Sequence, residues 1–272
     1  MKIFDIDLQP VTKEVPELID DLVKSNKVNL VFTPNPEILL DASEDTKFKE
    51  TLNQADLLFP DWIGLYLAYL ILDNPYNKII NIFLLPYFIL KVILSKKSLF
   101  KKYGKKICGS DFTRECIEYA DNNSLWVFIL DLHNPTDEKK VKSQKDLIPK
   151  LQKLYPNIKW YLEIYQEENH DKVVKNISES QATFCFATLW VKKQESLLLS
   201  LKPSMKDIRV AAWIWSSVDY LIGFQFRAPS WMQKAWLEWL YRLYTSPNKK
   251  RQLSKIWRAL VLFPIAVINS KK

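Results

Sequence analysis

Short apolar runs alternate with amphipathic stretches from the beginning of the chain. Between residues 14 and 24, for example, Leu18, Ile19, Leu22 and Val23 fall on one stripe of a helix. The pattern predicts helices at residues 14–24, 46–55 and 62–72 and strands at residues 28–33 and 56–60. Strand and helix therefore follow one another in turn.

The same alternation continues through the middle of the chain. It predicts strands at residues 125–131, 158–164 and 183–189 and helices at residues 136–154 and 172–177. Strands that alternate with helices are typical of a mainly parallel sheet. We therefore expect an α/β fold with a mainly parallel, Rossmann-like sheet flanked by helices.

Polar side chains follow the first two predicted strands. Thr33 and Asn35 come after the strand at residues 28–33, and Asp61 comes after the strand at residues 56–60. Because ligands bind where the carboxyl ends of parallel strands meet, we expect these three residues near one site. Asn35 followed by Pro36 is also a helix start, so Thr33 and Asn35 have a second interpretation as turn and cap residues.

Positive charge is concentrated in two segments. Residues 74–110 contain eight lysines and no acid, and residues 239–272 contain eight lysines or arginines and no acid. These segments carry +16 in a chain of net charge +8, so the remainder carries −8. Such separation indicates a polyanionic surface as partner. Long apolar blocks within both segments favour an anionic membrane over nucleic acid.

The apolar stretch at residues 79–94 interrupts the strand and helix pattern. Its 16 residues, broken by Pro86 and charged at Lys91, are few for a spanning helix, which needs about 20. We interpret residues 79–106 as an apolar and basic insertion that forms a membrane-interface helix or hairpin. The alternative is a buried core helix pair with a solvated lysine tail.

Cysteine and histidine usage indicates neither disulfides nor a metal centre. The three cysteines, Cys108, Cys116 and Cys185, lack metal-type spacing, and His133 and His170 lie far apart in the sequence. The first residues lack a signal-peptide pattern. We expect a cytoplasmic protein that needs no metal or other cofactor.

Five motifs occur in a specific order along residues 28–247. They are Thr33-Pro-Asn-Pro-Glu37, Pro60-Asp61, Gly109-Ser-Asp111, Lys193-Gln-Glu195 and Asp219-Tyr-Leu-Ile-Gly223, with Arg227 after them. In this order the chain resembles the WecG/TagA/CpsF family of bacterial glycosyltransferases. The resemblance implies transfer of N-acetylmannosamine or a related sugar from a UDP-sugar to a polyprenyl-diphosphate-linked acceptor. It also implies a possible oligomer.

The resemblance assigns roles to individual residues. It makes Asp61 the catalytic base, with Thr33 beside it, and places Asn35 and Asp111 with the bound substrates. Gln194, Glu195, Asp219 and Arg227 match motifs near the nucleotide. From the residues alone, Glu195 is equally a solvated helix residue, and Asp219 a helix cap.

The C-terminal part is basic and rich in tryptophan. Helices are predicted at residues 228–244 and 248–267, so we divide the chain into an α/β domain at 1–227 and an appendage at 228–272. The resemblance implies that this appendage docks peripherally on the inner face of the cell membrane. Arg242, Arg251 and Arg258 are candidates for binding the lipid-linked diphosphate or lipid headgroups, since guanidinium groups bind phosphate oxygens in pairs.

Bulky residues replace several glycines of the family motifs. Trp62, Trp190, Trp213 and Trp215 stand at such places, and only four glycines remain in the chain. Glycine permits close approach of the backbone to a ligand. The donor pocket is therefore either remodelled or closed, unless the indoles point away from it. A closed pocket would make the protein a non-catalytic, membrane-docked partner of another glycosyltransferase.

Overall fold

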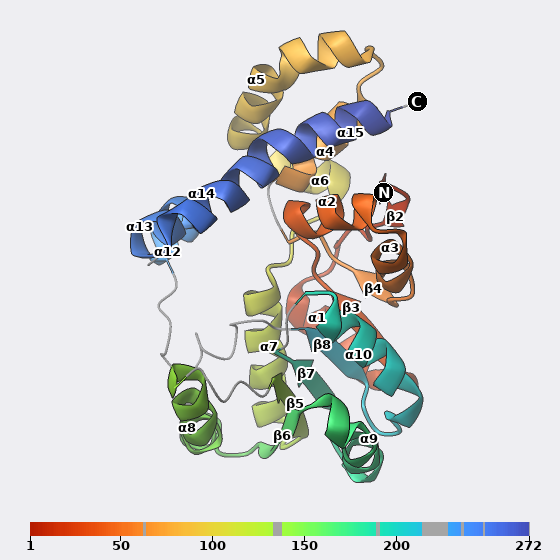
Figure 1. Cartoon of the computed structure of the whole chain (residues 1–272), viewed down its shortest axis with the longest axis vertical. Coiled ribbons are helices and arrows are strands. Elements are labelled where there is room, and N and C mark those ends of the chain that lie inside the picture. The colour runs from red at the N-terminus through yellow and green to blue at the C-terminus, as the bar shows by residue number, and fades with distance from the viewer. Residues whose placement is uncertain are drawn as a thin grey trace.

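A parallel sheet of six strands lies at the centre of the α/β domain (Figure 1). The computed structural model describes residues 1–61, 64–132, 138–188, 191–213, 228–234, 237–246 and 248–271. The sheet has the order β4-β3-β8-β7-β5-β6, and all of its pairings are parallel. Its strands are β3 (Asn29–Phe32), β4 (Leu57–Leu58), β5 (Trp126–Leu132), β6 (Lys159–Tyr165), β7 (Phe184–Ala187) and β8 (Val210–Trp213).

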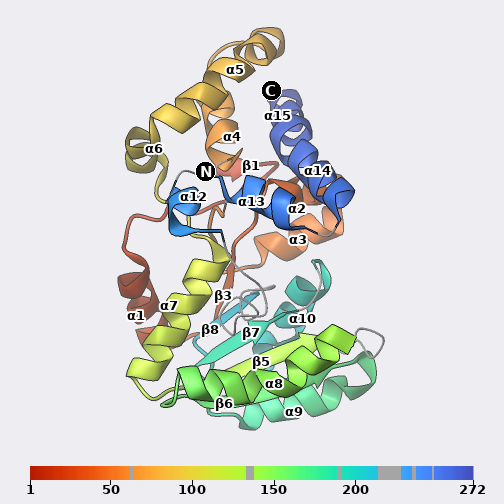
Figure 2. The ribbon, with the colours of Figure 1, turned by 90° about the vertical axis from the view of Figure 1, so that its left-hand side faces the viewer.

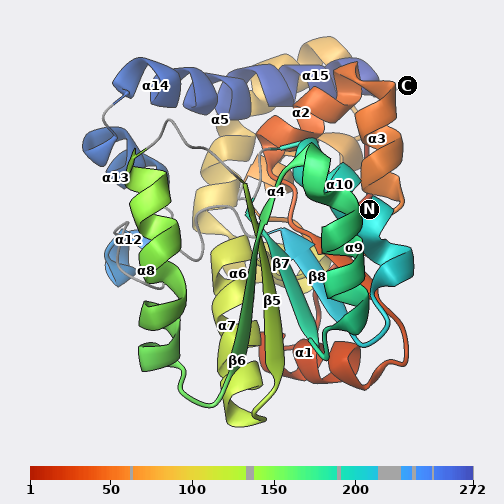
Figure 3. The ribbon, with the colours of Figure 1, turned by 60° about the horizontal axis from the view of Figure 1, so that its bottom comes forward.

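Helices cover both faces of the sheet, as Figure 3 shows. One face packs against α1 (Val15–Lys24), α7 (Gly109–Asn122) and α8 (Glu138–Leu154). The other packs against α2 (Pro36–Glu44), α3 (Thr46–Asn53), α9 (His170–Glu179) and α10 (Lys193–Leu201). Alternation within β3 directs Leu30 and Phe32 to the second face and Val31 to the first. The predicted fold class is confirmed, and most predicted elements lie within two or three residues of the observed ones.

A layer of helices lies beyond the sheet, at the upper end of the molecule in Figures 1 and 2. It contains α4 (Gly64–Asp73), α5 (Lys78–Leu94), α6 (Lys96–Tyr103) and α15 (Phe263–Ser270). The segment at residues 79–94 is one helix that continues through Pro86, and the chain then bends by 93° into α6. The core-helix alternative is wrong, because Phe83 and Leu94 are 79% and 72% exposed.

The C-terminal residues form two short helices followed by one long helical segment. Residues 228–244 do not form the single predicted helix, because the non-helical Leu237 lies between α12 (Ser230–Lys234) and α13 (Glu238–Thr245). After them α14 (Lys249–Trp257), a π-helical turn (Arg258–Leu262) and α15 run on without a break. Phe263, Val267 and Ile268 of α15 are fully buried in the same core as the sheet.

A two-stranded hairpin begins the chain and packs below α15. Its strands β1 (Lys2–Ile3) and β2 (Ile6–Asp7) are antiparallel, and Phe4 contacts Phe263 edge to face at 5.9 Å between ring centroids. The two ends of the chain thus stabilise one another. The predicted boundary at residue 227 lies outside the described residues and stays a prediction.

Candidate active site

A cavity of about 580 Å³ opens where β3, β4 and β8 end. Its walls come from the residues after β3 and β4, from the start of α7, and from α13 and α14. Six of the predicted site residues outside the basic helices lie in the described part of the chain, and three of them, Thr33, Asn35 and Asp61, line the cavity. These three side chains therefore lie together at the sheet edge, whereas Asp111, Gln194 and Glu195 do not line the cavity.

Asn35 both lines the cavity and caps a helix. Its side-chain oxygen accepts a hydrogen bond from the backbone N–H of Ile38 at 3.0 Å, which caps the first turn of α2. The cap interpretation is therefore confirmed, and it fixes the side chain at the cavity wall. Thr33 is 5% exposed, directly before this turn.

Gly109 brings the start of α7 against Thr33. A Cβ atom at Gly109 would lie 2.8 Å from the Thr33 hydroxyl oxygen, so no larger residue fits without displacing one of them. Gly109 and Ser110 both line the cavity. The positive end of the α7 dipole consequently faces it, which favours a bound anion.

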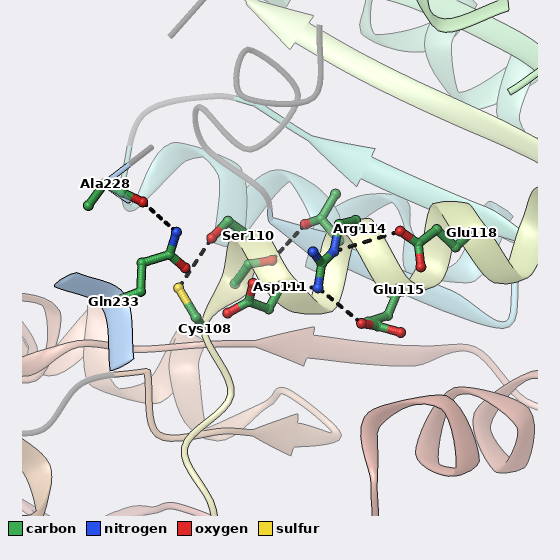
Figure 4. A network of polar contacts seen from close by, with 10 residues as sticks. Cys108, Ser110, Asp111, Arg114, Glu115, Glu118, Ala228 and Gln233 are labelled. Atoms are coloured by element: carbon green, nitrogen blue, oxygen red, sulfur yellow. Dashed lines mark hydrogen bonds and ion pairs between the residues drawn. The ribbon is translucent and has the colours of Figure 1, made fainter. Parts of the chain in front are cut away.

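Asp111 lies one residue further along α7 (Figure 4), and it does not line the cavity. Its carboxylate is 3.9 Å from the Arg114 guanidinium, which also reaches Glu115 at 3.2 Å and Glu118 at 3.8 Å. The Cys108 thiol and the Ser110 hydroxyl are 3.2 Å apart at the helix start. Among these residues it is Cys108 and Ser110, not Asp111, that line the cavity.

The pKa of Asp61 is raised to about 6. Burial raises it most, and the charge of Glu238 also raises it. Lys106, a hydrogen bond from Cys108 and Arg242 act in the opposite direction and favour the carboxylate. Asp61 is thus a partly buried carboxyl group with cations nearby, ionised in most molecules at neutral pH and more basic than a free aspartate.

The three candidate arginines have different environments. Arg242 and Arg251 line the cavity, and Arg242 pairs with Glu238 at 2.8 Å. Arg258 is not part of the cavity wall and instead forms an ion pair with Asp41 of α2. The structure therefore brings two of the three arginines to the site and gives Arg258 a contact that joins the C-terminal helix to α2.

Gln194 and Glu195 lie in the first turn of α10 and are both 0% exposed. The interpretation of Glu195 as a solvated helix residue is therefore wrong. The Gln194 amide donates to a Glu195 oxygen at 3.2 Å, and the other carboxyl oxygen has no hydrogen-bond partner among the described residues. Burial raises the pKa of Glu195 to about 7. Neither residue lines the cavity described above.

The turn before α10 depends on Lys192. Its φ of 70° lies in the left-handed region, which residues other than glycine rarely adopt. Its ammonium group binds Asp45 at 2.7 Å and lies 5.4 Å from the centre of the Phe48 ring. Lys192 thus joins the start of α10 to α3.

Trp213 fills the end of β8 beside Thr33. Its indole stacks on Phe32, with centroids 4.7 Å apart and planes 4° apart, and its N–H donates to the Thr33 hydroxyl at 3.2 Å. The interpretation that the bulky side chains point away is wrong for Trp213, which lines the cavity. The remaining volume is nevertheless within the range of small-molecule sites, about 300–1,000 Å³.

Some of the residues named in the predictions lie outside the described residues. These are Trp62, Trp190, Trp215, Asp219, Arg227, and the first two residues of the helix predicted at residues 136–154. Conversely, Lys106, Cys108 and Glu238 line the cavity although no sequence motif predicted them as site residues. Lys106 belongs to the lysine-rich segment at residues 74–110, and only the fold reveals its position near Asp61.

In the part of the chain that the structure describes, no cluster of three or more His, Cys, Asp or Glu side chains is arranged to hold a metal ion. The cavity instead combines carboxylates with lysine and arginine side chains and a helix start. These groups suit a substrate that carries phosphate and hydroxyl groups.

Comparison with known sequences gives a match over the whole chain. The profile described as "Glycosyl transferase WecG/TagA/CpsF family" matches residues 1–91 and 89–272, two segments that meet within α5. The chain is 26% identical to a Bacillus subtilis protein over 90% of its own length and 84% of the relative's. It is 24% identical to proteins of Bacillus spizizenii and Staphylococcus aureus, covering 90% and 89% of this chain and 82% and 81% of theirs. All three relatives are named N-acetylglucosaminyldiphosphoundecaprenol N-acetyl-beta-D-mannosaminyltransferase.

Proposed function

The chain belongs to the WecG/TagA/CpsF family of glycosyltransferases, and from this premise we propose that it transfers N-acetylmannosamine or a related sugar from a UDP-sugar to a polyprenyl-diphosphate-linked acceptor. The names of the Bacillus and Staphylococcus relatives support a lipid-linked N-acetylglucosamine as that acceptor. We place the reaction at the inner face of the cell membrane, in surface-polysaccharide synthesis. No metal or other cofactor takes part in this proposal.

Asp61 is the general base in this reaction. It takes the proton of an acceptor hydroxyl while that oxygen forms a bond to the anomeric carbon of the donor sugar. The bond from that carbon to the UDP oxygen breaks, and UDP leaves with the bonding electrons. The observation that carries this role is the carboxyl group of Asp61 in the cavity wall, with a pKa of about 6 and with Lys106 and Arg242 near it.

Cationic groups of the cavity bind the diphosphates. Arg242 and Arg251 come from the basic C-terminal helices and face the same cavity as Asp61. A guanidinium binds phosphate oxygens through two parallel N–H donors. Arg242 and Arg251 are therefore the candidates for the acceptor diphosphate. Gln194 and Glu195, which the resemblance places near the nucleotide, are fully buried and do not line this cavity, so their role in donor binding stays a prediction.

Substitution of Asp61 by asparagine tests the role of base. Asparagine keeps the shape but cannot accept the proton, so we expect Asp61→Asn to lower kcat by about 10²- to 10⁴-fold. UDP-sugar binding, followed by calorimetry on the same preparation, should stay unchanged. A variant that transfers sugar at the wild-type rate would remove Asp61 from this role.

A second candidate function is favoured by Trp213. Its indole stands where the family motif has glycine and occupies the sheet edge beside Thr33. A site closed in this way would leave a membrane-docked protein that partners another glycosyltransferase without catalysing transfer. Absence of UDP binding would favour this alternative. Oligomerisation stays a prediction.

A further inference from the structure

Helix α5 exposes large apolar side chains along its whole length. Seven of them, more than 45% exposed each, are Ile79, Ile82, Phe83, Tyr87, Leu90, Ile93 and Leu94. Among the residues of α5 only Asn81, Phe88 and Val92 are buried. A helix at the surface of a water-soluble domain normally carries polar residues on its outer face. The outer face of α5 therefore needs an apolar environment.

The structure holds α5 in a fixed position beside the C-terminal helix. The Lys78 ammonium donates to the carbonyl of Asn269 at 2.9 Å, close to the end of α15. In return, Lys271 donates to the carbonyls of Ile71 and Tyr76 at 3.3 and 3.1 Å. Because α5 also packs on α4 and α15, its exposed apolar side chains point away from these helices.

Positive charge flanks this apolar face. After the 93° bend, α6 begins at Lys96 and carries the exposed Lys97 and Lys101. Two other lysines of the segment are used within the protein, Lys102 by Asp73 and Lys105 by Glu14. No acidic residue occurs between residues 74 and 110. Lysines next to an apolar surface attract anionic lipid headgroups.

We propose that α5 inserts its outer face into the surface of an anionic bilayer, as a membrane-binding element separate from the basic helices α13 and α14. With 17 residues and Pro86 within it, α5 is shorter than the about 20 residues of a spanning helix, so it lies in the plane of the interface. A bilayer fits better than a second copy of the chain, since two lysine-rich segments repel one another whereas anionic headgroups attract them.

Insertion of α5 also orients the cavity. The continuous helix from α14 to α15 runs from the cavity wall, where Arg251 and Lys255 lie, to α5 (Figures 1 and 2). Arg258 and Lys255 fasten this helix to Asp41 and Glu37 of α2. The membrane surface is thereby held at a fixed distance from the site. Only this last step rests on the proposed function.

Flotation with vesicles tests the proposal. The vesicles contain phosphatidylcholine with or without phosphatidylglycerol, and the full chain is compared with the double variant Phe83→Glu/Leu94→Glu. Both positions are highly exposed, so the variant should fold, which thermal melts verify. The matched control is Leu154→Glu, also an exposed leucine at a helix end (52%) but at the opposite end of the molecule. We expect the double variant to bind anionic vesicles at least fivefold more weakly than the wild type. The control should bind them as well as the wild type.

A double variant that floats as well as the wild type overturns the proposal. Light scattering supplies a second test. If the wild type is a dimer, the double variant is a monomer and both bind vesicles equally, a second copy of the chain covers α5 and the proposal is overturned. The double variant Lys97→Gln/Lys101→Gln should weaken binding only where phosphatidylglycerol is present. Normal vesicle binding by a wild-type protein without transfer activity would refute the proposed function and leave this inference standing.

Discussion

Asp61 is subject to two opposing effects on its pKa. Burial favours the neutral acid, whereas Lys106, Cys108 and Arg242 favour the carboxylate. The result, a pKa of about 6, leaves the group ionised at neutral pH and still basic enough to accept a proton from a hydroxyl in the transition state. Its basicity therefore depends on two parts of the chain that are far apart in the sequence, residues 106–108 and the helix that carries Arg242.

The pH dependence of transfer should report this pKa. A base acts only when deprotonated, so kcat/KM should rise with pH through about 6 and fall about tenfold per unit below it. Lys106→Gln removes a charge that favours the carboxylate, so it should move this acidic limb to higher pH. Initial rates between pH 4.5 and 8 measure both profiles. A limb that stays in place in Lys106→Gln would show that another group controls it.

Trp213 links the sheet edge to Thr33 by a stack and a hydrogen bond. Trp213→Phe keeps an aromatic ring on Phe32 but loses the N–H donor, and should lower the free energy of unfolding by about 1 kcal/mol. Trp213→Ala also leaves a hole in a buried region and should cost about 3–5 kcal/mol. Urea denaturation measures both. Equal losses for the two variants would contradict a stabilising role of the stack.

Local sequence rules predicted the role of a residue only where its neighbours in the sequence determine its contacts. The cap at Asn35 follows from Asn-Pro at the end of a strand, and the structure has it. The burial of Glu195 and the position of Lys106 beside Asp61 depend on packing between distant segments. Charge counting assigned Lys106 to a lipid surface, because a sum over residues 74–110 does not distinguish one lysine from another.

At the scale of elements, ion pairs fasten α14 and the π-helical turn to α2. Arg258 pairs with Asp41, and Lys255 lies 3.7 Å from Glu37. Both pairs are partly exposed, so each contributes little to stability by itself. Their main effect is to position α14, the helix that brings Arg251 to the cavity wall.

Variants of two arginines distinguish a residue that binds substrate from one that holds the C-terminal helix in place. Arg242→Met removes a guanidinium that faces the cavity and should raise the acceptor KM by about 10- to 100-fold, as loss of a charge-assisted hydrogen bond does. Arg258→Met should leave that KM within about twofold and lower the free energy of unfolding by about 1 kcal/mol or less. Steady-state kinetics and urea denaturation measure these effects. The reverse order would place Arg258 on the diphosphate.

Element boundaries were predictable to the extent that one face of each element is apolar. The strands and the helices around them follow from that pattern, as in α1 and β3. The pattern fails between residues 228 and 244, where regularly spaced aromatic residues predict one helix but the chain forms α12 and α13. The pattern also left residues 79–94 undecided between one helix and a hairpin, because a proline often breaks a helix. In the structure the helix continues through Pro86.

At the scale of the whole molecule, the two basic segments lie together. They are separated by more than a hundred residues, yet α15 packs on α5 and lysines at both helix ends bind carbonyls of the other segment. One helix in the described residues, Lys249–Ser270, is long and apolar enough to cross a membrane. Its buried residues, among them Phe263 and Val267, pack into the domain core, so its contacts tie it to the protein. Removing it would therefore test folding rather than membrane binding.

Calorimetric titration of the purified full chain with UDP and with UDP-N-acetylmannosamine tests the central claim, that the cavity beside Trp213 is a working site. We expect one site per chain with micromolar affinity, about −8 kcal/mol. The 580 Å³ that remain beside Trp213 are the reason for this expectation. Absence of heat at millimolar nucleotide would contradict it and would favour a non-catalytic partner of another glycosyltransferase.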